Sequence, residues 1–393
     1  MKKQTKDSLT AKRIMVISAV DVSFKILLIA QIKAAQGAGY EVYGICSKGS
    51  YFDWLTQQGI KMIPVTIKRS ISPLSDLVAL WKMYRCFNRL RIDIVHTHTP
   101  KACLFGQLAA KMAGVPIIIS TLHGFYFHDN MKPLVRWFHI IMEKIAAKCS
   151  TMILSQNPED IETAIKLKIC KPERIKLLGN GVDLNKFDPK RFDGKFKKEK
   201  RKEIGIPEDA VVIGIIGRLV EEKGYLELCE AFGEMIKTHD NVWLVIVGPD
   251  EPEKADRIST DIFKQYDIEP WTLYLGSRDD IPELMSCFDI YVLPSWREGF
   301  PRSAIEAAAM SLPIVATNIR GCRQVVENGV NGILVPVRDA KKLTEALITL
   351  IDNPGSRMKM GQAGYEKAHR EFDEKKVCQI VLDTYRECSN KIE

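Results

Sequence analysis

The chain has 393 residues, of which 46% are apolar, so it is too long for one hydrophobic core and suits two domains. Its net charge of +8 is uneven, because residues 1–200 hold 33 Lys and Arg against 16 Asp and Glu (+17), whereas residues 201–393 hold 24 against 33 (−9). It has no nucleic-acid-binding motif, no apolar run of membrane-spanning length and no C-x-x-C pair among ten Cys, which excludes a nucleic-acid binder, a membrane-spanning protein and a disulfide scaffold.

The first half of the chain alternates between apolar strands and helices. Its first segment, 1–12, is polar and lacks the apolar core of a secretory signal, so we expect a cytoplasmic protein. Helices are expected at 24–35 and 73–90, and strands that alternate with helices imply a parallel sheet. The expected strands are 13–18, 41–46, 61–65, 92–97, 116–121, 151–155 and 175–178.

Three histidines accompany two of these strands. His96 and His98 alternate along one strand, and His123 follows the strand at 116–121. Because ligands bind beyond the carboxyl ends of such strands, His123 is a candidate site residue, with a purely structural histidine as the alternative. At least one of His96 and His98 is expected to have a core or supporting role. No further ligand cluster accompanies them, so no zinc site is expected.

A basic amphipathic stretch, 131–148, follows the aromatic loop 125–128. It mixes Lys and Arg with Trp, Phe and Ile at helical spacing, which is typical of helices that lie in a bilayer interface. A helix packed on its own sheet has the same periodicity and is an equal alternative. The positive charge of the first half favours contact with an anionic membrane surface.

A run of Lys and Arg at 190–202 marks the expected domain boundary, and we interpret it as a solvated linker. After it the alternation of strands and helices restarts and ends in two polar helices at 354–369 and 373–390. The expected strands of this half are 211–217, 242–248, 272–276, 289–293, 313–317 and 332–335.

Two cations stand at the first strand-to-helix turn of the second half. The apolar run 210–216 predicts a buried strand, Gly217 and Arg218 follow it, and Lys223 precedes a predicted helix at 225–237. Arg offers a bidentate fork for phosphate oxygens and Lys a compact charge. The turn therefore suggests a phosphate site, with a surface salt-bridge cluster as the alternative.

A second turn of this kind carries two carboxylates, Glu298 and Glu306. It connects the strand at 289–293 to an Ala-rich helix from Ser303, whose free N–H groups and dipole attract a phosphate. The two carboxylates can accept hydrogen bonds from hydroxyls on either side of a bound diphosphate, as in a nucleotide sugar. A loop charge and a solvated helix face are the alternative for this motif alone. The turn reads Glu298, Gly299, Phe300 and Pro301.

With these motifs in this order, the sequence resembles the retaining glycosyltransferases of family four. The resemblance implies an α/β protein with the GT-B fold, in which two facing Rossmann-like domains with parallel sheets enclose an interdomain cleft. Residues 1–188 would form the acceptor-side domain, 189–372 the nucleotide-sugar-binding domain, and 373–393 a helix that crosses back onto the first. Further matching segments, the last two typical of bacterial enzymes that build lipid-linked oligosaccharides, are 121–124, 180–187, 328–335, 93–101 and 123–128.

The resemblance also implies roles for the candidate residues. Arg218 and Lys223 would stabilise the leaving diphosphate, and His123 would contact the donor sugar near its reacting carbon. Glu306 would bind the ribose and Glu298 the transferred sugar. The expected catalytic residues are His123, Arg218, Lys223 and Glu298. The expected donor-binding residues are Gly217, Arg218, Lys223, Glu298, Gly299, Phe300, Pro301 and Glu306. The expected acceptor-side residues are Ser23, His98, Phe125, Tyr126 and His128.

The function implied is metal-independent transfer of a hexose or N-acetylhexosamine, with retention, from a nucleotide sugar to a saccharide on polyprenyl diphosphate. UDP is favoured by its frequency in the family. No cofactor is expected, and the chain contains no Asp-x-Asp metal motif. The enzyme would be cytoplasmic and attached peripherally to the inner face of the cytoplasmic membrane. A sugar-nucleotide epimerase, a transferase with a soluble acceptor and a nucleotide-binding scaffold remain alternatives.

Two segments depart from the usual family pattern. The loop at 19–24 lacks the paired glycines that bring the backbone close to donor phosphates, so contacts there would be looser or made by side chains such as Ser23. Gln324 stands where a Glu is common. Both departures concern local contacts rather than the fold.

Overall fold

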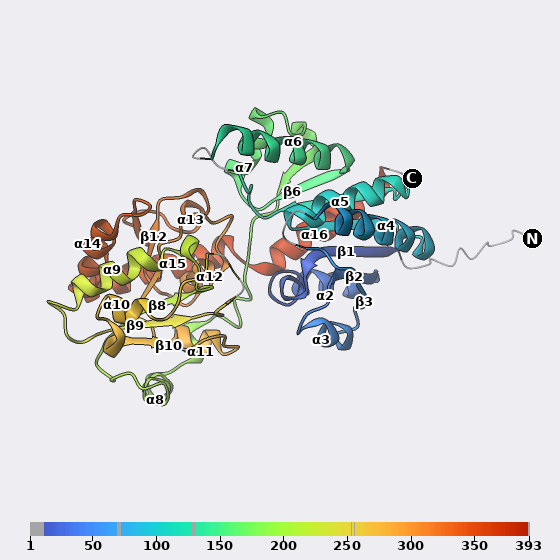
Figure 1. Cartoon of the computed structure of the whole chain (residues 1–393). Helices are drawn as coiled ribbons and strands as arrows, with labels where there is room; N and C mark the ends of the chain where they lie inside the picture. The colour runs from blue at the N-terminus through green and yellow to red at the C-terminus, as the bar shows by residue number, and fades with distance from the viewer. Residues whose placement is uncertain (1–11, 69–71, 128–130, 253, 255, 392–393) are drawn as a thin grey trace, which may run out of the picture. The chain divides into compact units, whose positions relative to one another are not determined.

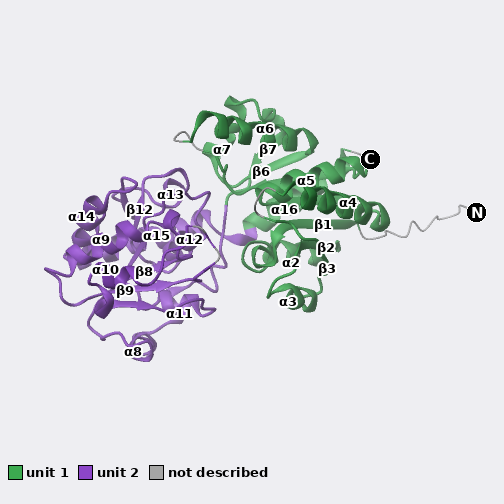
Figure 2. Ribbon diagram, in the orientation of Figure 1, with its two compact units in different colours: residues 1–179, 376–393 green, residues 180–375 purple. Residues whose placement is uncertain are grey.

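The computed structural model describes residues 12–68, 72–127, 131–252, 254 and 256–391, and it contains two compact units (Figures 1 and 2). Unit 1 holds the chain up to Gly179 and again from Lys376, and unit 2 holds Asn180–Lys375. The division falls before the expected boundary at 188, because Val182 and Phe187 are already buried in the core of unit 2.

Unit 1 is built on a seven-stranded parallel sheet in the order β3-β2-β1-β4-β5-β6-β7. Its strands are β1 (Arg13–Val20), β2 (Glu41–Ser47), β3 (Lys61–Pro64), β4 (Ile94–His98), β5 (Ile117–Leu122), β6 (Met152–Ser155) and β7 (Ile175–Leu177). Its helices are α1 (Asp21–Ser23), a π-helical turn at Phe24–Leu28, α2 (Ile29–Gly37), α3 (Phe52–Gln57), α4 (Pro73–Leu90), α5 (Pro100–Met112), α6 (Pro133–Cys149) and α7 (Pro158–Lys166). The C-terminal helix α16 (Glu374–Asn390) also belongs to unit 1, apart from its first two residues.

Helices cover both faces of this sheet. Ile14 and Val16 of β1 pack with α2, α3 and the C-terminal helix α16, whereas Met15 and Ile17 pack with α4 and α5 on the other face. Burial on both faces explains why β1 is a continuous apolar run rather than an alternating one.

Unit 2 is built on a six-stranded parallel sheet in the order β10-β9-β8-β11-β12-β13. Its strands are β8 (Val211–Ile216), β9 (Val242–Val247), β10 (Thr272–Tyr274), β11 (Ile290–Leu293), β12 (Ile314–Thr317) and β13 (Gly332–Val335). Its helices are α8 (Gly194–Glu203), α9 (Tyr225–Met235), α10 (Ile262–Gln265), α11 (Ile281–Met285), α12 (Arg302–Ala309), α13 (Arg320–Val325), α14 (Ala340–Ile351) and α15 (Pro354–Glu371).

All the strands predicted from the sequence are present, with ends within two residues of the expected ones. The predicted solvated linker at 190–202 is wrong. Most of it forms α8, in which Lys200 is only 9% exposed and its Nζ lies 2.9 Å from an Asp280 oxygen, while Arg201 pairs with Asp289 at 2.8 Å. These two ion pairs hold the charged helix α8 against the rest of unit 2. Within the described ranges, no helix has both the length and the apolar character needed to span a membrane.

Candidate active site

Two strand-to-helix turns of unit 2 lie side by side because β8 and β11 are neighbours in the parallel sheet. Gly217 and Arg218 follow β8, and Pro294 begins the turn after β11. Gly224, which precedes α9, has a φ of 75°, and a Cβ there would collide with the carbonyl oxygen of Pro294. Glycine is therefore required where the two turns touch.

An ion pair joins the two turns. Lys223 Nζ lies 2.6 Å from Glu298 Oε1, and the hydroxyl of Ser295 donates to the same oxygen at 2.8 Å. The side chains of Lys223 and Glu298 are only 18% and 13% exposed. An ammonium carries three N–H donors, and one of them points to Glu298. The structure thus brings together a predicted phosphate-binding cation and a predicted sugar-binding carboxylate that are 75 residues apart.

Arg218 stands beside this pair between two carboxylates. Its guanidinium donates to Glu222 at 3.0 Å and to Glu251 at 3.1 Å, and Glu222 also pairs with Arg297 at 3.1 Å. Burial by itself would raise the pKa of Glu222, but the guanidinium of Arg297, with Arg218 and Lys223, lowers it overall. Arg218 is therefore part of a salt-bridge cluster, and a phosphate would bind in competition with these carboxylates.

Glu306 lies in the second turn of α12 and is held by Arg302. The two side chains pair at 3.0 Å, and Arg302 also donates to the carbonyl of Gly181 at 3.3 Å and lies 3.8 Å from Glu374. Burial raises the pKa of Glu306, and the positive charge of Arg302 opposes the shift. A partly desolvated carboxylate of this kind suits hydrogen bonds from neutral hydroxyls, as on a ribose.

The segment before α12 places the remaining predicted donor residues. Pro301 precedes the first helical residue, and the carbonyl of Phe300 accepts a hydrogen bond from the Asn180 amide at 3.1 Å. The ring of Phe300 packs edge-on against Phe372 at 5.8 Å. Gly299 lies between Phe300 and Glu298, so this short loop connects the ion pair to the start of α12.

In unit 1, the predicted histidines form a buried chain at the carboxyl ends of β4 and β5. His98 Nδ1 lies 3.1 Å from His123 Nε2, and His123 Nδ1 lies 3.1 Å from the amide oxygen of Gln156. Because that oxygen only accepts, His123 carries its proton on Nδ1 and accepts from His98 at Nε2. His96 instead contacts Tyr385 at 2.7 Å and Thr121 at 2.8 Å, which is a supporting role in the core.

The histidine chain is uncharged near neutral pH. Burial lowers the pKa of His96 to about 3 and that of His123 to about 4, from an ordinary value of 6.5, and it lowers the pKa of His98 well below that value. As the pH falls below 6.5, these histidines bind protons in the unfolded chain but not in the folded chain. The free energy of unfolding is then expected to fall by about 1.4 kcal/mol per pH unit for each histidine down to its folded pKa.

Urea unfolding at pH 7, 6 and 5 measures this loss. In the variant His123→Gln, the free energy of unfolding is expected to fall less steeply with pH than in the wild type, because one of the three histidines no longer contributes. Parallel declines in the two proteins would contradict a depressed pKa at His123.

The aromatic loop after β5 places the other predicted acceptor-side residues. Phe125 is buried and stacks on Phe127 at 4.7 Å, whereas Tyr126 is 46% exposed. His128 lies outside the described residues. Ser23 ends α1, directly after β1, and is partly exposed.

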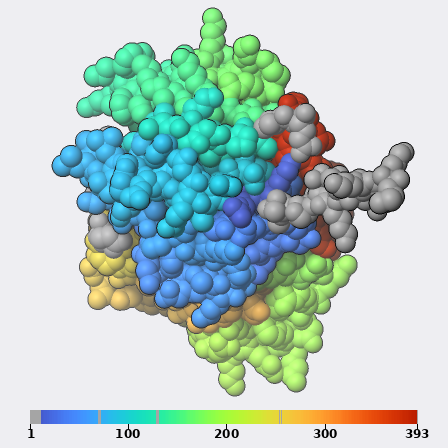
Figure 3. Space-filling model, turned by 90° about the vertical axis from the view of Figure 1, so that its right-hand side faces the viewer, coloured from blue at the N-terminus to red at the C-terminus, as the bar shows by residue number. Residues whose placement is uncertain are grey.

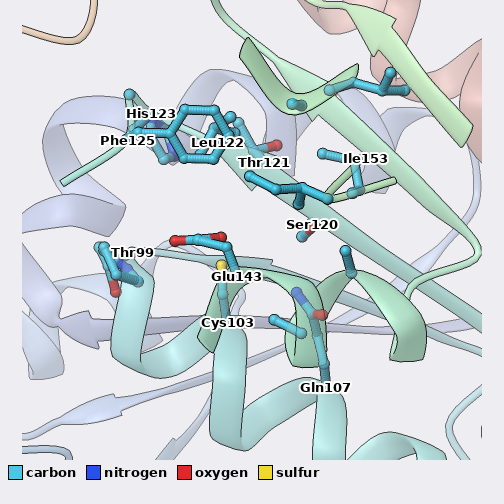
Figure 4. Close-up of a pocket in the computed structure, with 17 residues that line it drawn as sticks. Thr99, Cys103, Gln107, Ser120, Thr121, Leu122, His123, Phe125, Glu143 and Ile153 are labelled. Carbon is cyan, nitrogen blue, oxygen red and sulfur yellow. The ribbon is translucent and has the colours of Figure 1, made fainter. Parts of the chain in front are cut away.

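A small cavity opens beside this histidine chain (Figure 4). His123 and Phe125 lie on one side of it, Thr99 and Cys103 on the other, and Glu143 of α6 points between them. Burial, aided by the charge of Asp160, raises the pKa of Glu143 to about 7. Among the described residues, no group of three or more His, Cys, Asp or Glu is placed to hold a metal ion.

Sequence reasoning missed five residues of these clusters. Arg218–Glu222 and Arg302–Glu306 are pairs at a spacing of four residues, and this helical spacing could have revealed Glu222 and Arg302. Nothing in the local sequence marks Glu251, Gln156 or Glu143, because only the tertiary fold brings them to their partners.

Two families match the sequence. The model described as "Glycosyl transferases group 1" matches residues 196–367, and "Glycosyl transferase 4-like" matches residues 13–157. The first lies in unit 2 and the second in unit 1.

Individual relatives match over most of their length. The UDP-Gal:alpha-D-GlcNAc-diphosphoundecaprenol alpha-1,3-galactosyltransferase of Escherichia coli is 32% identical over 318 residues, 80% of this chain and 81% of the relative. The N,N'-diacetylbacillosaminyl-diphospho-undecaprenol alpha-1,3-N-acetylgalactosaminyltransferase of Campylobacter jejuni is 28% identical over 359 residues, 90% and 93% of the two chains. The solved structure of HepE from Anabaena with UDP and glucose has a TM-score of 0.82 at 20% identity and covers 96% of this chain and 100% of its own, which shows a shared fold.

Proposed function

The chain belongs to the group 1 glycosyl transferases, and on this premise we propose that it transfers a hexose or N-acetylhexosamine from a UDP-sugar to a saccharide on polyprenyl diphosphate. The observation that carries the proposal is the ion pair of Lys223 and Glu298, which joins the turn expected to bind phosphate to the turn expected to bind the sugar. The acceptor class is supported by the names of the E. coli and C. jejuni relatives, both of which act on undecaprenyl diphosphate sugars.

In the proposed mechanism, the bond between the anomeric carbon and the diphosphate oxygen breaks through an oxocarbenium-like state. Negative charge grows on the leaving diphosphate, and Arg218, Lys223 and the N–H groups at the start of α12 stabilise it. These fixed charges supply the stabilisation without a metal ion. Glu306 binds the ribose and Glu298 binds hydroxyls of the transferred sugar, and by the family resemblance His123 would contact that sugar near its reacting carbon.

The acceptor hydroxyl would attack from the face that the diphosphate leaves. The departing phosphate oxygen takes its proton, and the configuration at the anomeric carbon is retained. This stereochemistry rests on the family resemblance.

The release of UDP from a panel of UDP-sugars, with and without a lipid-linked acceptor, distinguishes the candidate functions. A transferase releases UDP in step with the acceptor added. An epimerase converts the nucleotide sugar without acceptor, a nucleotide-binding scaffold does neither, and release that requires a free sugar would indicate a soluble acceptor. Only the first outcome agrees with the proposal.

We further propose that the protein works at the inner face of the cytoplasmic membrane through α6. Four side chains near its start, Leu134, Val135, Trp137 and Phe138, are between 44% and 76% exposed, and the helix buries only Ala146 and Ala147. This exposure supports the interfacial interpretation of the helix over the packed one.

A second exposed apolar stripe runs along α4, the light blue helix on the surface in Figure 3. Leu74, Leu77, Val78 and Trp81 repeat at helical spacing and are between 52% and 82% exposed. α5 packs against both α4 and α6. All three helices begin beyond the carboxyl ends of parallel strands, so their first turns lie at the same edge of the sheet. The two stripes therefore support one membrane-facing surface.

The protein is expected to bind vesicles that contain anionic lipid at low salt and to dissociate as salt rises, because salt screens basic residues worth roughly 1 kcal/mol each near the surface. Sedimentation with anionic and neutral vesicles at two salt concentrations measures this. Trp137→Ser should weaken binding, whereas Met358→Ser, at a 73% exposed position of unit 2, should not. Absence of binding to anionic vesicles at low salt would contradict attachment to the membrane and would indicate a soluble acceptor.

A further inference from the structure

The cavity in unit 1 beside His123 has a volume of about 50 Å³. It lies between the carboxyl end of β5, the first turns of α5 and the helix α6 (Figure 4). Leu122, Ala146 and Ala147 contribute to a mainly apolar wall. At roughly 10–15 Å³ for each water-sized probe, the cavity has room for about three or four small heavy atoms.

One polar side chain of this wall has no protein partner. Within the described part of the chain, Glu143 makes no hydrogen bond and no ion pair, although it points into the cavity (Figure 4). The hydroxyl, amide and imidazole groups of the wall are each hydrogen-bonded within the protein. These groups belong to Thr99, Gln107, Ser120, Thr121 and His123.

Glu143 is half-buried, so its carboxyl group loses part of its hydration to the apolar wall while no described protein group donates to it. The raised pKa of Glu143 has the same physical origin as this cost, namely loss of solvent around the charge. An N–H donor on a ligand would satisfy the group, and a small apolar group attached to that donor would fill the rest of the cavity.

We propose that this cavity receives the 2-acetamido group of the acceptor sugar, with Glu143 accepting its amide N–H and the apolar wall enclosing its methyl group. The acetamido group has four heavy atoms, which matches the size of the cavity. The inference rests on the proposed function, because it assigns an acceptor subsite to that same enzyme.

The position of the cavity fits the chemistry of the relatives. Both named relatives form α-1,3 linkages to acceptor sugars that carry an N-acetyl group. In such sugars the attacking 3-hydroxyl is next to the acetamido-bearing carbon, so the acetamido group must lie near the reacting centre. His123, which by resemblance lies near the reacting carbon of the donor, lines the cavity.

Two acceptors with the same lipid tail test the proposal: GlcNAc-diphosphate-lipid and glucose-diphosphate-lipid, which lacks the acetamido group. The wild type is expected to show a KM for the first that is roughly ten- to a hundred-fold lower. Glu143→Leu should reduce this preference to about three-fold or less, while the KM of the nucleotide sugar stays unchanged. Glu143→Gln keeps an accepting oxygen and should restore most of the preference. Glu173→Leu, at an exposed carboxylate of unit 1, should behave as the wild type.

Equal KM values for the two acceptors in the wild type would overturn the acetamido subsite alone and leave the transferase function in place. Retention of the preference by Glu143→Leu would also overturn it, as would an equal loss with both acceptors, which indicates a structural role. Transfer by the wild type to neither acceptor would overturn both the subsite and the proposed function.

Discussion

Replacing Lys223 or Arg218 with alanine is expected to lower kcat about ten- to a thousand-fold, the loss typical of removing one donor that stabilises a developing oxyanion. Each cation would neutralise charge that grows on the diphosphate as the sugar leaves. Because that charge is greater in the transition state than in the bound donor, the loss should fall on kcat more than on the KM of the donor.

The pairing of Lys223 with Glu298 makes a stability control necessary. Loss of the ammonium leaves a largely buried carboxylate without its partner, so the variant must first show wild-type-like unfolding at the assay temperature. Lys237→Ala is a matched control, because its ammonium pairs with Glu234 on the exposed surface of the same unit and should leave kcat unchanged. Near-normal turnover in both Lys223→Ala and Arg218→Ala would remove the phosphate-binding role.

The second large effect separates the two carboxylates. Glu306→Gln is expected to weaken the binding of UDP itself about ten- to a hundred-fold, because the ribose hydroxyls then donate to a neutral amide oxygen in place of a charged carboxylate. Glu298→Gln should leave UDP binding near the wild-type value and weaken the binding or turnover of the UDP-sugar. Titration calorimetry with UDP and with the UDP-sugar measures both.

The surroundings of each carboxylate sharpen this test. Glu306 pairs with Arg302 and Glu298 with Lys223, so each substitution also releases one cation. If these released cations governed affinity, both variants would bind the UDP diphosphate more tightly rather than less. Glu345→Gln, which breaks an exposed ion pair with Lys342, serves as a control. Equal losses of UDP affinity in the Glu298 and Glu306 variants would refute the division of roles.

The strands could be predicted from the sequence because both sheets are covered by helices on both faces. The run Val211–Ile216 is apolar throughout, and its side chains pack alternately into the two core clusters of unit 2. Turns with Gly or Pro then separate each run from the next helix. This alternation predicts an α/β protein with parallel sheets, and the family resemblance carried by the motifs implies the GT-B class.

The segment at 190–202 could not be predicted in this way. Its composition indicates a solvated linker, yet Lys200 is buried against Asp280, which is 80 residues away in the sequence. A run of charged residues is expected to be exposed to solvent unless its ion-pair partners are known. Here only the tertiary fold brings those partners, Asp280 and Asp289, to the helix.

In the candidate site too, the sequence predicts some residues, whereas their contacts depend on the tertiary fold. Arg218, Lys223, Glu298 and Glu306 stand out because they flank predicted strand-to-helix turns, and their roles remain predictions. The contact between Lys223 and Glu298, the histidine chain that ends at Gln156 and the orientation of Glu143 depend on the packing of separate elements. No local pattern encodes these contacts.

The mass of the lipid product tests the proposed transfer most directly. The wild type would be incubated with GlcNAc-diphosphate-lipid, a panel of UDP-sugars and EDTA, with Lys223→Ala as the paired variant. The expected result is an acceptor heavier by one hexose or one N-acetylhexosamine with one of the donors, undiminished by EDTA and strongly reduced in the variant. An acceptor of unchanged mass with every donor, from protein that unfolds cooperatively and is therefore folded, would contradict the proposed function.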